Sequence, residues 1–168
     1  YRNFWVEPFV LASAVGQIVL GGWLLVRRVR AGLRGRWARV QVWSGGVFLF
    51  FLTEHLIALV LARWVDGLDT NFYWPASVMR GAPFTWYFVP YYFLGVASLF
   101  VHLGCAARLM LMRGAYRRFA GVSFWVFSVL GVWMAGVIVW TLLGGFYEIE
   151  LPQEWVACLQ RFVAGYAP

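Results

Sequence analysis

Charged residues are scarce in this sequence. Only 12% of its 168 residues are charged, 62% are hydrophobic, and lysine is absent. Soluble domains are close to one quarter charged, so the composition excludes an ordinary soluble domain and predicts an integral membrane protein. The net charge of +7 comes from arginines that lie mostly between apolar runs, where basic residues set the orientation in the membrane. We therefore expect no binding to nucleic acid.

Cysteine and histidine are also rare. The two cysteines, Cys105 and Cys158, are far apart, and there is no C-x-x-C-H motif. This excludes covalently attached c-type haem and predicts no disulfide framework. The two histidines, His55 and His102, both lie inside apolar runs.

Four apolar runs are long enough to cross a bilayer, which takes about 20 residues. They cover residues 8–26, 43–64, 88–112 and 122–146. The first run has no small-residue cleavage site, so we interpret it as a span and not as a signal peptide. Residues 1–168 are therefore expected to form a single all-α membrane domain, an up-down-up-down bundle of four transmembrane helices.

The arginines predict the orientation of this bundle. The connections at 27–39 and 113–119 are rich in arginine, whereas the connection at 66–87 has only Arg80. The positive-inside rule then places the first and third connections in the cytoplasm and both termini on the outer, periplasmic side of the inner membrane. After the fourth run, apolar residues share one helical face over about 152–164. This stretch is too short to span and predicts a short C-terminal interfacial helix.

The positions of the two histidines suggest a shared metal. Ionisable side chains are costly in a span and usually face the bundle interior. Counted from Trp43 and Tyr116 as interfacial residues, His55 and His102 lie about 18 Å and about 21 Å deep, at 1.5 Å per residue. Imidazoles at similar depth can bind one haem iron from opposite sides. The sequence therefore predicts one b-type haem with His55 and His102 as its axial ligands.

A flat cofactor needs room beside its ligands, and the helical neighbours of His102 are small. They are Gly95, Ser98, Cys105 and Ala106. Small residues also let membrane helices pack closely, which is an alternative explanation. Haem propionates need cations, and the sequence offers Arg108 toward the inner side or Arg63 toward the outer side without choosing between them. Arg108 can also simply extend to the interface.

Glu54 adjoins His55 in the second run. An ionised carboxylate without a partner is costly in lipid, so we expect Glu54 to be protonated or hydrogen bonded. The options are proton handling near a quinone, a bond to a histidine Nδ1–H group, or a bond to Gln17 or Thr141 on another helix. We expect a structural or proton-handling role.

The stretch LFVHLGCAARLMLMR at 99–113 resembles the haem helix of membrane-anchor cytochrome b subunits of succinate dehydrogenases and fumarate reductases. In that family a haem-ligating histidine is followed six positions later by arginine and then by an apolar stretch. His102, Arg108 and LMLM match this pattern. The resemblance implies a second imidazole from a neighbouring helix, for which His55 is the counterpart. It also implies a quinone as a further ligand and the other subunits of a membrane redox complex as partners.

Electron transfer is the function that these features predict. The chain would be a non-catalytic subunit of an oxidoreductase complex in a respiratory chain, relaying electrons between a redox partner subunit and a quinone or another haem. The alternative is a haem-free structural subunit that packs against a larger membrane complex, with the histidines as polar contacts between spans. A transporter would need more polar groups at mid-depth, and no nucleophile–base constellation is evident.

Overall fold

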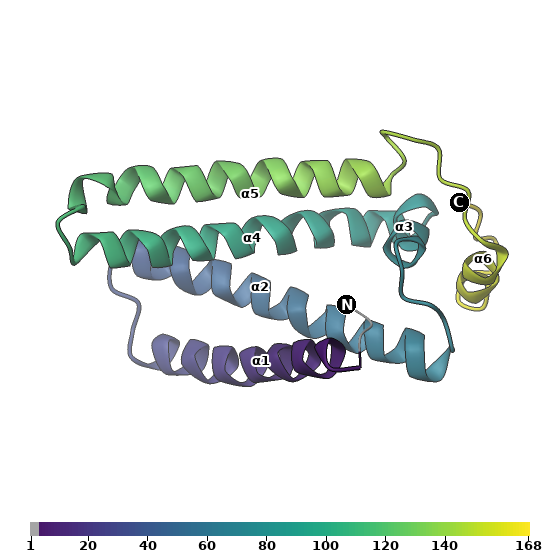
Figure 1. Ribbon diagram of the computed structural model, residues 1–168, viewed down its shortest axis with the longest axis horizontal. Coiled ribbons are helices and arrows are strands. Elements are labelled where there is room, and N and C mark those ends of the chain that lie inside the picture. Colours follow the sequence, from purple (N-terminus) through teal and green to yellow (C-terminus); the bar gives the residue numbers. More distant parts are fainter. Residues whose placement is uncertain (1–3) are drawn as a thin grey trace.

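The structure is a computed structural model that describes residues 4–168, and the described chain is helical without strands (Figure 1). The helices are α1 (Val6–Arg30), α2 (Arg36–Val60), α3 (Tyr73–Arg80), α4 (Phe84–Met112), α5 (Ala120–Leu142) and α6 (Gln153–Gln160). A π-helical turn at Leu61–Val65 prolongs α2, and a 3₁₀ turn at Arg117–Phe119 precedes α5.

Four helices are long and apolar enough to cross a membrane: α1, α2 with its extension, α4, and α5 with its preceding turn. The expected all-helical membrane architecture with four candidate spans is therefore confirmed. The first three helices extend beyond their apolar runs, because a helix can continue through the headgroup region. The last one ends earlier than expected, at Leu142, because Gly144 adopts a left-handed backbone with φ +84°.

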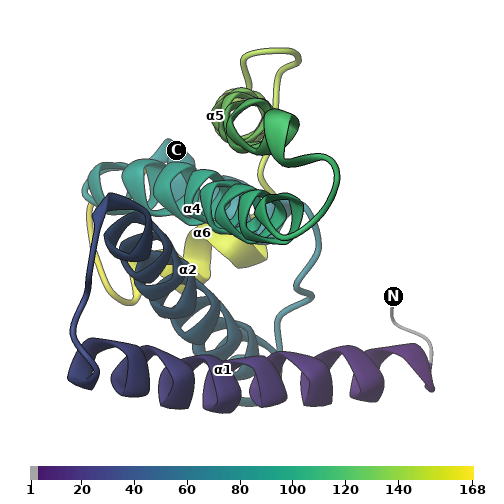
Figure 2. The same cartoon turned by 90° about the vertical axis from the view of Figure 1, so that its left-hand side faces the viewer.

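The long helices pack in sequence order. α5 lies against α4, α4 against α2, and α2 against α1. The α1–α2 and α4–α5 connections lie at one end of the molecule, which we call the arginine end, and α3 and α6 lie at the other, which we call the cap end (Figure 1). Figure 2 looks roughly along α4 and α5. In this view α1 runs across the bottom of the picture, below α2. No residue of α1 is buried, so α1 is the most peripheral span.

Glycines set the close approach of the long helices. A Cβ atom at Gly131 of α5 would lie 2.3 Å from Cβ of Phe100 on α4. A Cβ atom at Gly95 of α4 would lie 2.1 Å from the ring of Phe51 on α2. Each glycine therefore receives a phenylalanine of the neighbouring helix, the arrangement by which small residues pack membrane helices.

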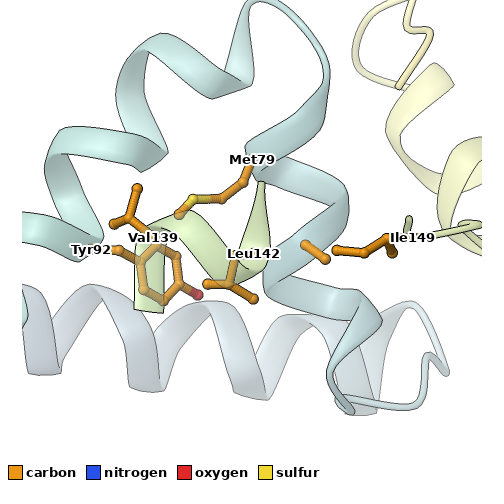
Figure 3. Close-up of a cluster of buried hydrophobic side chains, with 6 residues drawn as sticks. Met79, Tyr92, Val139, Leu142 and Ile149 are labelled. Carbon is orange, nitrogen blue, oxygen red and sulfur yellow. The ribbon is translucent and has the colours of Figure 1, made fainter. Parts of the chain in front are cut away.

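The cap end has its own core. Side chains from α3, α4, α5 and the segment before α6 meet there (Figure 3). They are Ala76, Met79, Tyr92, Val139, Leu142 and Ile149. The connection between α2 and α4 contains α3, and Pro75 lies in the first turn of this helix, where proline is well tolerated. The connection is therefore folded over the ends of α4 and α5.

The C-terminal segment is bound to α3. Trp155 of α6 is only 1% exposed, and α6 packs against α3. The Tyr166 hydroxyl donates a hydrogen bond of 2.6 Å to the backbone carbonyl of Ser77. Burial raises the pKa of Tyr166 and the nearby Arg80 opposes this, so the phenol stays protonated and able to donate at neutral pH.

Tyr166→Phe is expected to destabilise the cap end. The substitution leaves the buried Ser77 carbonyl without its donor, which costs about 1–3 kcal/mol. The thermal unfolding midpoint of the detergent-solubilised chain should fall accordingly. Tyr147→Phe is the control, because Tyr147 is 51% exposed. An equal fall in both variants would contradict the role of the Tyr166–Ser77 bond.

Candidate functional site

His102 faces α2 in the half of the molecule near the arginine end. Its Nδ1 atom lies 3.0 Å from the backbone carbonyl oxygen of Gln41. A carbonyl oxygen only accepts, so Nδ1 carries a proton, and in the neutral imidazole Nε2 then has the lone pair. Nε2 makes no hydrogen bond to any residue in 4–168. An imidazole fixed through Nδ1 and open at Nε2 has the arrangement of a metal-ligating histidine.

Gly45 of α2 makes room for this imidazole. A Cβ atom at Gly45 would lie 2.9 Å from both Cε1 and Nδ1 of His102, a contact that any side chain would relieve only by moving the ring. The next residue differs: a Cβ atom at Gly46 would meet only Leu25, at an ordinary 3.8 Å. The position of the ring therefore depends on the missing side chain at 45.

A cavity of about 540 Å³ lies beside His102, between α1, α2 and α4. Its walls are mainly leucine, and its polar lining residues are Gln17, Arg28, Gln41 and His102. Cofactor sites are typically apolar, with a small number of polar groups and volumes of about 300–1,000 Å³. The cavity therefore has the size and lining for a ring-shaped cofactor next to His102.

His55 lies in a different place, toward the cap end. Its ring centroid is 5.5 Å from that of Phe51, 5.2 Å from that of Trp74 and 6.1 Å from that of Tyr92. It lines a separate cavity of about 630 Å³ formed with the α2–α3 connection and α3. Within the described chain, His55 makes ring contacts but no hydrogen bond.

The two histidines are not brought together. His102 lies opposite Gly45 of α2, whereas His55 lies opposite Tyr92 of α4. Gly45 and His55 are ten residues apart on α2, and Tyr92 and His102 are ten residues apart on α4. The two contacts are therefore about 15 Å apart along the helices. One iron needs both imidazoles at one level, so the expected single haem held by both His55 and His102 does not fit this structure.

The small residues near His102 pack helices and do not line its cavity. Gly95 receives the Phe51 ring, and the Ser98 hydroxyl donates to the Gly95 carbonyl at 2.9 Å. Cys105 is a buried free thiol. None of these, nor Ala106, is among the residues that line the cavity. The alternative explanation of this face, close helix packing, is the one that its contacts support.

The two arginines singled out from the sequence are engaged elsewhere. The Arg108 guanidinium lies over the ring of Trp37, 4.0 Å from its centroid. Arg63 forms an ion pair with Glu7, near the cap end. The cation at the cavity is instead Arg28. From the sequence it was interpreted only as part of an arginine-rich connection.

Glu54 is exposed on the surface of α2. Its carboxyl group lies near the Tyr87 side chain of α4. The partners expected from sequence are engaged differently, since Gln17 lines the His102 cavity and the Thr141 hydroxyl donates to the Val137 carbonyl. Glu54 therefore makes a contact between α2 and α4 near the cap end.

No three His, Cys, Asp or Glu side chains within residues 4–168 come together as a metal-binding group. A haem iron does not require such a group, because the porphyrin supplies four of its donors and the protein supplies axial ligands. Comparison with known proteins finds no match to this chain among protein-family models, curated protein sequences or solved structures.

Proposed function

We propose that the chain is the membrane subunit of a redox complex and holds one b-type haem on His102. It relays single electrons between a redox partner subunit and a quinone or another haem. One observation carries the proposal: His102 lines an apolar cavity, and its Nδ1 is bonded to the Gln41 carbonyl, which leaves Nε2 of the neutral imidazole as the ligand atom. This proposal uses one imidazole of the chain, where the sequence predicted two.

Each residue around the cavity has a defined task in this proposal. The Gln41 carbonyl fixes the tautomer and orientation of His102. Gly45 allows the imidazole to approach α2, and Arg28 offers a cation to an acidic substituent of the ring. The leucine walls keep water away. The haem, when bound, supplies the one-electron chemistry, and the axial ligand and burial tune its potential.

The proposal includes an orientation in the membrane. The four spans alternate in direction, the arginine end faces the cytoplasm, and α6 lies at the outer interface. The support is the distribution of arginine: the two arginine-rich connections share one end of the molecule, and the α2–α4 connection at the other end has only Arg80. In a bacterium this membrane is the inner one.

The visible spectrum of the purified full chain, recorded before and after dithionite, tests the function. We expect a b-type spectrum and, on extraction, equimolar haem by the pyridine haemochrome assay. Expression in medium with added haem precursor ensures that a lack of haem in the host does not leave the site empty. A chain that is folded but haem-free under these conditions would favour the alternative, a structural subunit whose cavity holds lipid, for which the apolar lining is equally suitable.

Gly45→Ala is expected to weaken haem binding by about 10- to 100-fold, the usual effect of disturbing the contacts that orient a metal ligand. The new Cβ atom would displace the His102 ring. Titration of the haem-depleted variant with haemin measures the affinity. Gly46→Ala adds the same atom one residue away, in ordinary contact with Leu25, and should bind as the unaltered chain does. Equal affinities for both variants would contradict the assigned site.

A further inference from the structure

Arginines at the cap end have oxygen acceptors within the protein. The pairs are Arg63 with Glu7, Arg80 with the Ile149 carbonyl, and Arg161 with Asp66. Each of these guanidinium groups therefore directs at least one donor to a protein oxygen.

Arginines at the arginine end have no such acceptors. Ten of the 14 arginines lie there: Arg27, Arg28, Arg30, Arg34, Arg36, Arg39, Arg108, Arg113, Arg117 and Arg118. No acidic residue occurs between positions 8 and 53 or between 70 and 147. Among the described residues, none of the ten guanidinium groups forms an ion pair or donates a hydrogen bond to the protein. Four of them, those of Arg27, Arg36, Arg108 and Arg118, lie over aromatic rings instead.

Two of these guanidinium groups meet at one ring. The Cζ atom of Arg108 lies 4.0 Å and that of Arg36 lies 5.1 Å from the centroid of Trp37. The edge of the same ring contacts Phe124 of α5, with centroids 4.9 Å apart. We call Arg36, Trp37 and Arg108 the Trp37 cluster; it joins α2, α4 and α5 at the arginine end.

The cluster presents donors to an anion. A guanidinium group that lies over an aromatic ring contacts it through its face, and its N–H bonds point outward in its own plane. Planar N–H pairs suit phosphate, which accepts two parallel hydrogen bonds from one arginine. We propose that the Trp37 cluster binds the phosphate headgroup of an anionic phospholipid and thereby ties α2 to α4.

Position favours a lipid over an acidic protein partner. Trp37 is the second residue of α2, at the end of a span, where tryptophan is typical of headgroup depth. Arg108 belongs to α4 and is half-buried, whereas Arg36 of the same cluster is exposed, as are Arg30 and Arg34 at the same end. Arginine groups beside membrane spans form binding sites for anionic lipids. A docking protein would be expected to use the exposed loop instead.

Thermal unfolding of the full chain in a neutral detergent tests the proposal. Phosphatidylglycerol should raise the unfolding midpoint, whereas phosphatidylcholine and inorganic phosphate at equal concentration should not. The double variant Arg36→Gln/Arg108→Gln should lose most of the phosphatidylglycerol shift. Arg30→Gln/Arg34→Gln removes the same charge from the same end and leaves the Trp37 cluster intact, so it should keep most of the shift.

Three outcomes would overturn the proposal. Equal losses in the two double variants would assign the effect to diffuse charge. An equal shift with phosphatidylcholine or inorganic phosphate would exclude a site for an anionic lipid headgroup. The absence of any shift with phosphatidylglycerol would leave an acidic protein as the partner of these arginines.

Native mass spectrometry of the unaltered chain adds a measurement that needs no variant. After exchange into detergent with equal amounts of both lipids, the chain should retain phosphatidylglycerol in preference to phosphatidylcholine. Salt should reduce this retention, because the contact is ionic. Equal retention of the two lipids would overturn the proposal even where a variant fails to fold.

Discussion

His102→Ala is expected to yield a folded chain without bound haem, whereas His55→Ala keeps a full complement. Of the two histidines, only His102 lines the cavity between α1, α2 and α4, and its Nε2 has no hydrogen bond within the described chain. His55 lies about 15 Å further along the helices, among the rings of Phe51, Trp74 and Tyr92. The haem content of each purified variant, from the dithionite-reduced spectrum, measures the difference.

The two variants control for one another, since each removes one imidazole from a span. Circular dichroism should show unchanged helix content in both. Loss of haem from His55→Ala as well as from His102→Ala would restore the shared ligation that the sequence predicted. Retention in both would mean that neither imidazole is a ligand.

Gly131→Ala is expected to destabilise the contact between α4 and α5 strongly. The added Cβ atom would lie 2.3 Å from Cβ of Phe100, near the helix backbone, where a rotamer change gives little relief. Overpacking of this kind costs about 1–3 kcal/mol and occasionally more. The measurement is the thermal or denaturant-induced unfolding of the chain in detergent.

Gly136→Ala provides the matched control on the same helix. No atom lies within 4 Å of a Cβ placed at Gly136, and alanine is the better helix former, so its stability should stay within about 0.5 kcal/mol of the unaltered chain. A similar loss of stability in both variants would contradict the packing of α5 on α4 through Gly131.

The spans could be predicted because bilayer thickness imposes long apolar runs on the sequence. The level of each histidine could not, because it depends on how far α2 and α4 are displaced along one another. The depth estimate assumed that Trp43 and Tyr116 mark one interface. Gly45 lies opposite His102, so Trp43, two residues earlier, lies near the level of Gly104 and several turns inside Tyr116. In a chain with 11 tryptophans, a single tryptophan is a weak marker of the interface.

The residues around His102 could not be predicted from the sequence either. The bond that orients its ring comes from the backbone of Gln41, and any residue there would offer the same carbonyl. The sequence did not distinguish Arg28 from the other arginines of its cluster, because its place at the cavity depends on how α1 packs beside α2. The small residues on the helical face of His102 are present as the sequence indicated, but the same pattern serves helix packing, as Gly95 and Phe51 illustrate.

Addition of carbon monoxide to the dithionite-reduced full chain tests most directly whether one imidazole holds the cofactor. His102 is the only histidine that lines the cavity within the described chain, so a haem there keeps a coordination position that carbon monoxide can occupy. We predict a clear shift of the Soret band. A reduced b-type spectrum that carbon monoxide leaves unchanged would mean that both axial positions are filled, and would contradict the account.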